Sequence, residues 1–149
     1  LGAPHWDMYA RGALLGLTRG TGRAQIVRAA LEAIAYQSAD VVAAMQTDYP
    51  RPLQLLRVDG GAAANDFLMQ FQADILGCRI ERPACMESTA QGAAALAALA
   101  LGWHTPESLA ARAAEKVFAS AMPEERRKKL LAGWRKAVRR AAKWAEPGS

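Results

Sequence analysis

The 149-residue chain lacks the features that define several protein classes. It has only two cysteines, Cys78 and Cys85, which are too few for a disulfide framework. We expect both thiols to be reduced, as small apolar side chains of a cytoplasmic protein. Their spacing is not that of a zinc knuckle, and both His5 and His104 lie far away along the chain. The sequence therefore predicts no metal site.

Long hydrophobic runs are also missing. The most apolar stretches are rich in alanine and are interrupted by glycine, glutamine or charge, whereas a membrane-spanning helix needs about 20 apolar residues. Leu1 to Asp7 have neither the basic end nor the apolar core of a signal peptide. We expect no membrane span and, because the chain opens on Leu1, a fragment that begins within a longer protein.

What is present is typical of one globular domain or a large piece of one, with 52% hydrophobic and 22% charged residues. The charge is uneven. Residues 124–149 hold nine Lys or Arg against three acids, a net of +6, whereas residues 1–123 hold ten against eleven, a net of −1. Such a basic tail permits contact with nucleic acid or another acidic surface.

A structural interpretation of this tail is favoured over nucleic-acid binding. Leu130, Leu131, Trp134 and Val138 recur at three- and four-residue steps, which is typical of a helix with one buried stripe. The Lys and Arg residues then form its wetted face. We expect the helix to pack on the same domain and Pro147 to Ser149 to fray.

The predicted elements alternate between strands and helices. We expect short strands at residues 12–17, 53–58 and 79–82. We expect helices at residues 23–46, 64–76 and 88–101, one capped by Thr105, and one opened by Pro123. The helix over 23–46 should be long and well buried. Alternation of this kind predicts an α/β layer with at least partly parallel strands, and so few strands suggest that N-terminal strands of the sheet lie outside the chain.

The most informative stretch for function is DGGAAAND, which starts at Asp59 and joins a predicted strand to a predicted helix. Gly60 and Gly61 let a flat or phosphorylated ligand approach the main chain, at the strand end where α/β sheets bind ligands. The pattern is neither the Rossmann fingerprint nor the P-loop. The structural alternative is a tight turn with Asn65 or Asp66 capping the helix, and we interpret Asp59 as structural rather than as a base.

The predicted helix over 88–101 is composed almost entirely of small residues, which allow close approach to a sheet or another helix. We expect a structural role for it. Thr89 lies near its start, where a hydroxyl caps the helix more often than it faces a pocket.

Four blocks in order resemble the C-terminal half of glycerol kinases, which belong to the FGGY carbohydrate kinase family. They are LGAPHWDMYARGALLGL, TRGTGRAQIVRAALEAIAYQ, LRVDGGAAANDFLMQFQADILG and STAQGAAALAALALG. The family's C-terminal signature is matched at Gly12, Leu14, Gly16, Leu17, Gln25, Ile26, Ala29 and Glu32. The tail also resembles the end of a glycerol kinase, which favours the structural interpretation of the basic helix.

The resemblance implies a ribonuclease-H-like, actin-like ATPase fold of two domains with ATP and Mg²⁺ between them. Residues 1–122 would be part of the C-terminal nucleotide-binding domain, and residues 123–149 its extra helix. The turn at Gly60 and Gly61 would lie against the nucleotide, and Asn65 would contact it beside the adenine.

The resemblance also implies what the chain does not carry. The catalytic aspartate, the glycerol-binding residues and the phosphate-binding turns would precede Leu1, in a missing N-terminal domain, so we name no catalytic residue and expect the fragment alone to be inactive. We further expect a cytoplasmic homo-oligomer that binds ATP or ADP and glycerol. The alternatives are a related kinase of a pentulose or polyol, and a non-enzymatic module that uses the basic helix.

This chain departs from the family's usual residues at four positions. Asp66 replaces the more usual Asn, Ala63 a Val, His5 a Tyr and Gln91 a Leu. None of these changes removes Gly61 or Asn65, although Gln91 introduces a polar group where packing is expected.

Overall fold

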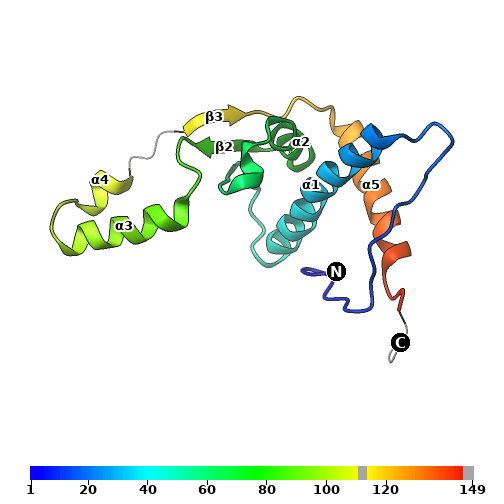
Figure 1. Ribbon diagram of the computed structural model, residues 1–149, viewed down its shortest axis with the longest axis horizontal. Coiled ribbons are helices and arrows are strands. Elements are labelled where there is room, and N and C mark those ends of the chain that lie inside the picture. Colours follow the sequence, from blue (N-terminus) through cyan, green and yellow to red (C-terminus); the bar gives the residue numbers. More distant parts are fainter. Residues whose placement is uncertain (111–113, 146–149) are drawn as a thin grey trace.

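The computed structural model describes residues 1–110 and 114–145 and shows helices beside a small sheet (Figure 1). The elements follow in the order α1 (Arg23–Asp48), β1 (Leu55–Arg57), the 3₁₀-helix η1 (Gly61–Ala64), α2 (Asp66–Leu76), β2 (Arg79–Pro83), α3 (Ser88–Ala100), α4 (Pro106–Ala110), β3 (Ala114–Phe118) and α5 (Glu124–Ala141). Pro147 to Ser149, where we predict fraying, lie outside the described residues.

The sheet has the strand order β1-β2-β3. β1 and β2 run parallel, with Leu56 opposite Ile80, which confirms the predicted parallel pairing. β3 pairs with β2 in the antiparallel direction, with Phe118 opposite Ile80. β3 was not predicted, because its sequence AEKVF is short, has two charged residues among five and carries little strand signal of its own.

The predicted strand over residues 12–17 is wrong. The segment is irregular and exposed, and Gly16 adopts a left-handed conformation with φ of +77°. Glycine weakens a strand, and no described strand lies alongside to supply hydrogen-bond partners.

α1 confirms the predicted long helix, but the expected burial is wrong. Only Ala35 and Tyr36 are buried, whereas Val27 is 53% exposed and Met45 is 64% exposed. α1 packs on α2 along one side, and its other faces meet little else of the described chain. Helical spacing thus located the helix correctly but not the surfaces that cover it.

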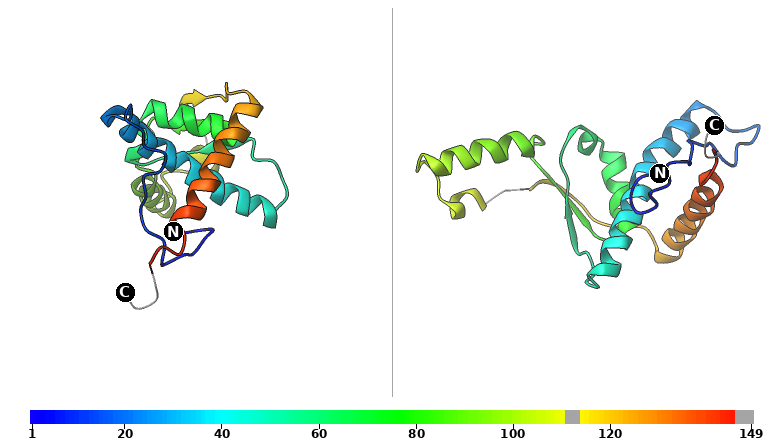
Figure 2. Two further views of the ribbon diagram at one scale, coloured as in Figure 1. Left: turned by 90° about the vertical axis from the view of Figure 1, so that its right-hand side faces the viewer. Right: turned by 90° about the horizontal axis from the view of Figure 1, so that it is seen from below.

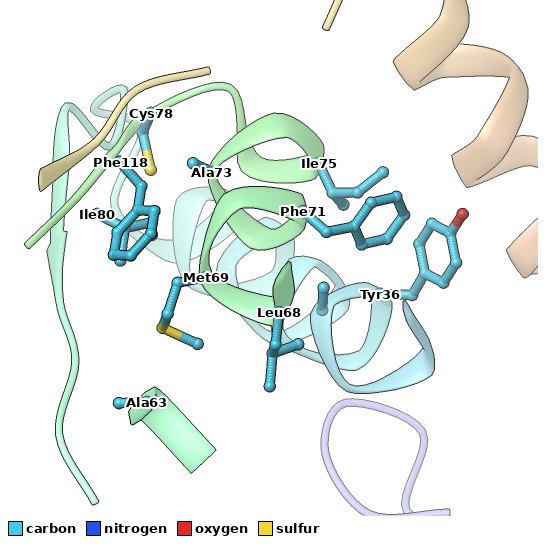
Figure 3. Packing of buried hydrophobic residues seen from close by; sticks show 11 residues of the cluster. Tyr36, Ala63, Leu68, Met69, Phe71, Ala73, Ile75, Cys78, Ile80 and Phe118 are labelled. Carbon is cyan, nitrogen blue, oxygen red and sulfur yellow. The ribbon is translucent and has the colours of Figure 1, made fainter. Parts of the chain in front are cut away.

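α2 joins β1 to β2 and supplies the centre of the core. It ends at Leu76, where the predicted helix ends, and the next residue, Gly77, adopts the left-handed conformation with φ of +68°. Leu68, Phe71 and Ile75 point into the cluster that Figure 3 shows between α1 and the sheet. Ile80 from β2 and Phe118 from β3 close the same cluster.

α5 is amphipathic, which confirms the predicted buried stripe. Val138 is buried, and Leu130, Leu131 and Trp134 pack against the core. The Trp134 indole stacks on the Tyr36 ring with centroids 5.4 Å apart. Burial raises the pKa of Tyr36 to about 12.

The N-terminal segment returns to the end of α5. The Asp7 carboxylate accepts hydrogen bonds from the backbone N–H groups of Tyr9, Ala10 and Lys143. These bonds lower the pKa of Asp7, with the bond from Lys143 contributing most. Residues at the two ends of the described chain are therefore fastened together.

The segment Ser88–Ala110, which we call the arm, extends away from the rest of the molecule (Figures 1 and 2). No residue of α3 is buried. α4 begins as predicted, with Thr105 Oγ1 accepting from the Ser108 N–H at 3.3 Å. The expected cap by Thr89 is wrong, because α3 starts after Glu87 with no side-chain cap. Within the described ranges, no helix combines the length and apolar character that crossing a membrane requires.

Candidate functional site

The candidate site is the turn that follows β1. It lies at the carboxyl end of the parallel pair β1 and β2, where open α/β sheets bind ligands. The Val58 N–H donates to the Glu81 carbonyl at 3.0 Å and extends the pairing by one residue. The Gly60 N–H then donates to the Met86 carbonyl at 2.9 Å, which ties the turn to the loop before α3.

Gly60 and Gly61 leave one side of the turn without side-chain bulk. Gly60 has φ of +81°, a left-handed conformation that favours glycine. A Cβ added to either glycine would meet no atom within 4 Å. The main chain is therefore open at this point, and a flat ligand can reach it without a clash within the described chain.

Asn65 is the N-cap of α2, which confirms the structural interpretation of this residue. Its Oδ1 accepts from the Leu68 N–H at 3.0 Å, and its own N–H donates to the Ala62 carbonyl at 3.2 Å. The side chain is exposed, and its Nδ2 donates to no residue of the described part of the chain. A capping role therefore leaves the amide nitrogen free to meet a ligand.

Asp66 is the first residue of α2 and is an ion-pairing group rather than a cap. Its carboxylate lies 2.8 Å from Arg82 Nη1 and 2.6 Å from Lys116 Nζ. These two hydrogen bonds, with Lys116 the stronger influence, lower the pKa of Asp66.

A pocket of about 280 Å³ opens between the ends of β1 and β2 and the start of α3. Its lining residues are Arg57, Val58, Asp59, Glu81, Pro83, Ser88 and Ala114. Asp59 makes no hydrogen bond or ion pair with the described residues, so its structural role remains a prediction. The pocket adjoins the turn along the sequence, because its lining residue Asp59 directly precedes Gly60.

The cysteines do not form a site. Both thiols are free, as expected. Cys78 is buried in the core, and burial raises the pKa of its thiol, whereas Cys85 is exposed. Residues 1–110 and 114–145 contain no group of three or more His, Cys, Asp or Glu placed to hold a metal ion.

Sequence reasoning missed Arg82, whose guanidinium lies directly beneath the turn. Its Nη1 donates to the Ala63 carbonyl at 3.0 Å and to the Ala64 carbonyl at 3.3 Å. The signal was available, because residues two apart in a strand share a face and Ile80 is an obvious core residue. Strand alternation therefore places Arg82 on the buried face, where a charge needs partners.

Comparison with solved structures defines the class of protein. The chain superposes on Plasmodium falciparum glycerol kinase with ADP at a TM-score of 0.84 and 40% identity, covering 93% of this chain and 28% of that one. It superposes on ligand-bound xylulose kinase from Lactobacillus acidophilus at a TM-score of 0.74 and 27% identity, covering 93% and 29%. The fold is thus that of a kinase C-terminal domain of the actin-like ATPase type, as predicted.

The chain belongs to the FGGY family of carbohydrate kinases, because the profile of that family's C-terminal domain matches residues 1–101. Among curated relatives, glycerol kinase of Caldanaerobacter subterraneus is 59% identical over 98% of this chain. Glycerol kinase of Symbiobacterium thermophilum is 59% identical over 97%. The chain spans about 30% of the length of each of these relatives.

Proposed function

We propose that this chain is the nucleotide-binding C-terminal part of an ATP-dependent glycerol kinase, a phosphotransferase that converts glycerol to sn-glycerol 3-phosphate. The open turn at Gly60 and Gly61, at the carboxyl end of the parallel strands, is the observation that carries the proposal. Identities of 59% to relatives named glycerol kinase support the substrate. A solved relative at 40% identity is named with ADP, which supports the nucleotide.

The residues present fit a nucleotide. The main chain of Gly60 and Gly61 offers a surface on which a purine can rest, and Asn65 Nδ2 offers a free donor beside it. ATP with Mg²⁺ supplies the phosphoryl group and shields its charge when bound. We assign no residue of this chain to Mg²⁺ and none to proton transfer, so the role of these three residues is to bind and orient.

The remaining parts of the proposal concern organisation. We expect residues 1–122 to form part of the nucleotide-binding domain and residues 123–149 to pack on it as an additional helix. The partner domain would hold glycerol, the catalytic aspartate and the phosphate-binding turns. We also propose that the enzyme is a cytoplasmic homo-oligomer.

Gly61 provides the sharpest test of the nucleotide turn. Its φ lies outside the left-handed region and its surroundings are open, so Gly61→Val should be tolerated by the fold. In the full-length kinase this variant should raise the KM for ATP about tenfold or more, because the added methyl groups occupy the space in which the purine base would rest on the main chain. The KM for glycerol should change less than twofold. An unchanged KM for ATP would remove the assignment.

Asn65 needs a variant that separates capping from ligand binding. Asn65→Ser retains an N-cap oxygen but loses the amide donor, whereas Asn65→Ala loses both. We expect both variants to raise the KM for ATP by a similar factor, and only Asn65→Ala to lower stability, by about 1 kcal/mol. A normal KM for ATP in Asn65→Ser would show that the residue only caps.

Isolated activity tests the expected division of labour. The 149-residue chain should show no ATP-dependent phosphorylation of glycerol. Turnover by this chain without a partner would contradict the placement of the catalytic groups outside it.

A second candidate is a sugar kinase of the same family, which the match to a xylulose kinase favours. Comparing kcat/KM for glycerol and for a pentulose in the full-length enzyme separates the two. A module that binds nucleic acid through α5 would instead lose DNA affinity steeply as salt is added. Absence of binding at low salt would end that alternative.

A further inference from the structure

Arg82 is a buried cation with an unusual set of partners. Its side chain is only 10% exposed, although it lies at the end of β2, close to the surface turn. Burying a charge costs several kcal/mol unless it is paired and hydrogen-bonded. The partners of Arg82 therefore show what the fold uses this residue for.

Two of these partners belong to the turn, and the other two, Asp66 and Glu115, belong to α2 and β3. Nη1 donates to the carbonyls of Ala63 and Ala64, the last two residues of η1, and to the Asp66 carboxylate at 2.8 Å. The chain between these acceptors includes Asn65. Arg82 thus binds the residues on both sides of Asn65. Asn65 caps α2 and follows the open turn at Gly60 and Gly61.

A second cation completes the arrangement. Lys116 from β3 binds the other oxygen of Asp66 at 2.6 Å. Both cations lie over the Phe118 ring, at 5.7 Å for Arg82 and 5.2 Å for Lys116. Arg82 Nε is buried and finds no partner in the described chain, and Nη2 lies 4.0 Å from the Glu115 carboxylate of β3, so the guanidinium contacts the turn through Nη1.

We propose that Arg82 is a positioning residue, which sets the conformation of the turn from Gly60 to Asn65 and thereby the affinity for the nucleotide base. This inference rests on the proposed function of the turn. A turn held in its binding conformation before the ligand arrives loses less entropy on binding, so the affinity depends on the hydrogen bonds from Arg82. Asp66, the first residue of α2, binds both Arg82 and Lys116, so it also connects the start of α2 to β3.

The first experiment measures kinetics in the full-length kinase. Arg82→Met removes the charge and the donors but keeps the apolar volume. Arg79→Met is the matched control, because Arg79 lies on the exposed face of the same strand and its side chain pairs, among the described residues, with Glu81 alone. We expect Arg82→Met to raise the KM for ATP about tenfold while the KM for glycerol and kcat change less than twofold, since the charge-assisted hydrogen bonds that hold the turn are lost.

A conservative variant keeps the test decisive if Arg82→Met does not fold. Arg82→Lys keeps the charge, but its side chain is one bond shorter and ends near the position of the guanidinium carbon, away from the three oxygens that Nη1 contacts. It should raise the KM for ATP by about threefold and leave the KM for glycerol unchanged. The inference is overturned if folded Arg82→Lys and Arg79→Met have the same KM for ATP, or if both Michaelis constants and kcat shift together.

The second experiment separates this inference from the proposed function. Amide hydrogen exchange of the full-length kinase in the absence of nucleotide reports the opening of the turn. In Arg82→Lys, the N–H groups of Ala63 and Asn65, which bond to Gly60 and Ala62, should exchange about tenfold faster than in Arg79→Met. The Ile75 N–H should be unaffected. Equal exchange rates of the turn amides in the two variants would refute the claim that Arg82 holds the turn.

The combined outcomes have distinct meanings. If the wild-type enzyme does not phosphorylate glycerol with ATP, but the turn amides exchange faster in the Arg82 variant, the proposed function is rejected and the positioning role of Arg82 is kept. If the wild-type enzyme is active, but the substitution of Arg82 changes neither the exchange of the turn amides nor the KM for ATP, the positioning role is rejected and the proposed function is kept.

Discussion

α2 and α3 both consist mainly of apolar residues but differ completely in burial. α2 carries large apolar side chains and α3 mostly alanine, and each follows a strand of the sheet. α2 buries the side chains of Leu68, Met69, Phe71, Gln72, Ala73 and Ile75. α3, in the arm, buries none, and Leu96 is 70% exposed.

The difference shows that apolar periodicity identifies a helix and not its neighbours. α2 has α1 on one side and β2 and β3 on the other, so water is excluded from most of its surface. α3 extends away from these layers (Figure 2). Because hydrophobic stabilisation is proportional to the apolar area removed from water, equivalent substitutions in the two helices should have very different costs.

The largest expected difference is between two leucines. Leu68→Ala removes a side chain that is 1% exposed and should lower the free energy of unfolding by about 2–5 kcal/mol. Leu96→Ala, in the arm, should change it by less than about 0.5 kcal/mol. Urea denaturation followed by circular dichroism measures both. Equal losses would mean that the arm packs on the rest of the chain in solution.

Glycine substitutions should change stability in opposite directions. Gly77 ends α2 in the left-handed conformation, and its Cβ would also meet the Arg127 guanidinium, so Gly77→Ala should cost about 1–2 kcal/mol. Gly92 lies within α3 with open space around it, and Gly92→Ala should raise the helical stability of the arm by about 0.5–1 kcal/mol. Thermal unfolding of both variants checks the signs. A stabilising Gly77→Ala would contradict the assigned helix end.

A tryptophan pair makes a finer comparison. Trp134 Nε1 donates to the Asp40 carboxylate at 2.7 Å, so Trp134→Phe should cost at least about 1 kcal/mol through the lost hydrogen bond. Trp103, in the arm, is 75% exposed, and Trp103→Phe should have almost no effect. Urea midpoints of the two variants provide the measurement. Similar midpoints would show that the α1–α5 contact contributes little.

The smallest expected effect is a pH dependence. The pKa of Asp7 is held below its ordinary 3.8, so its contribution is complete above that pH and is lost as the pH falls through the folded-state pKa. Asp7→Asn should reduce the loss of stability between about pH 5 and pH 2. The pKa of Glu107 in the arm is also lowered, but by its own backbone and Thr105, so Glu107→Gln should affect only α4. If the free energy of unfolding of the wild type and of Asp7→Asn depends on pH in the same way, Asp7 does not stabilise the contact between the two ends of the described chain.

Much of the fold was predictable because its signals are local. Asn65 and Gly77 bracket α2 as cap residues, and Pro106 lies in the first turn of α4, where proline is tolerated. The failures concern non-local contacts. The segment over residues 12–17 has the composition of a strand without a neighbouring strand, whereas β3 has a poor strand sequence and forms because β2 offers it an edge.

The candidate site divides in the same way. Gly60, Gly61 and Asn65 were identified from their order between a strand and a helix, and their assignment to a nucleotide stays a prediction. Strand alternation places Arg82 on the buried face, but its contact with the turn depends on the distance between two segments that the sequence separates, and this contact was missed.

The sequence by itself determined the helix boundaries, the parallel β1–α2–β2 unit and the glycines that keep the turn open, because each depends on conformational preferences of a few consecutive residues. Only the tertiary structure decided which apolar faces are covered, and that Arg82 and Lys116 meet at Asp66. Those outcomes depend on which surfaces approach closely enough to exclude water, and no local pattern encodes that distance.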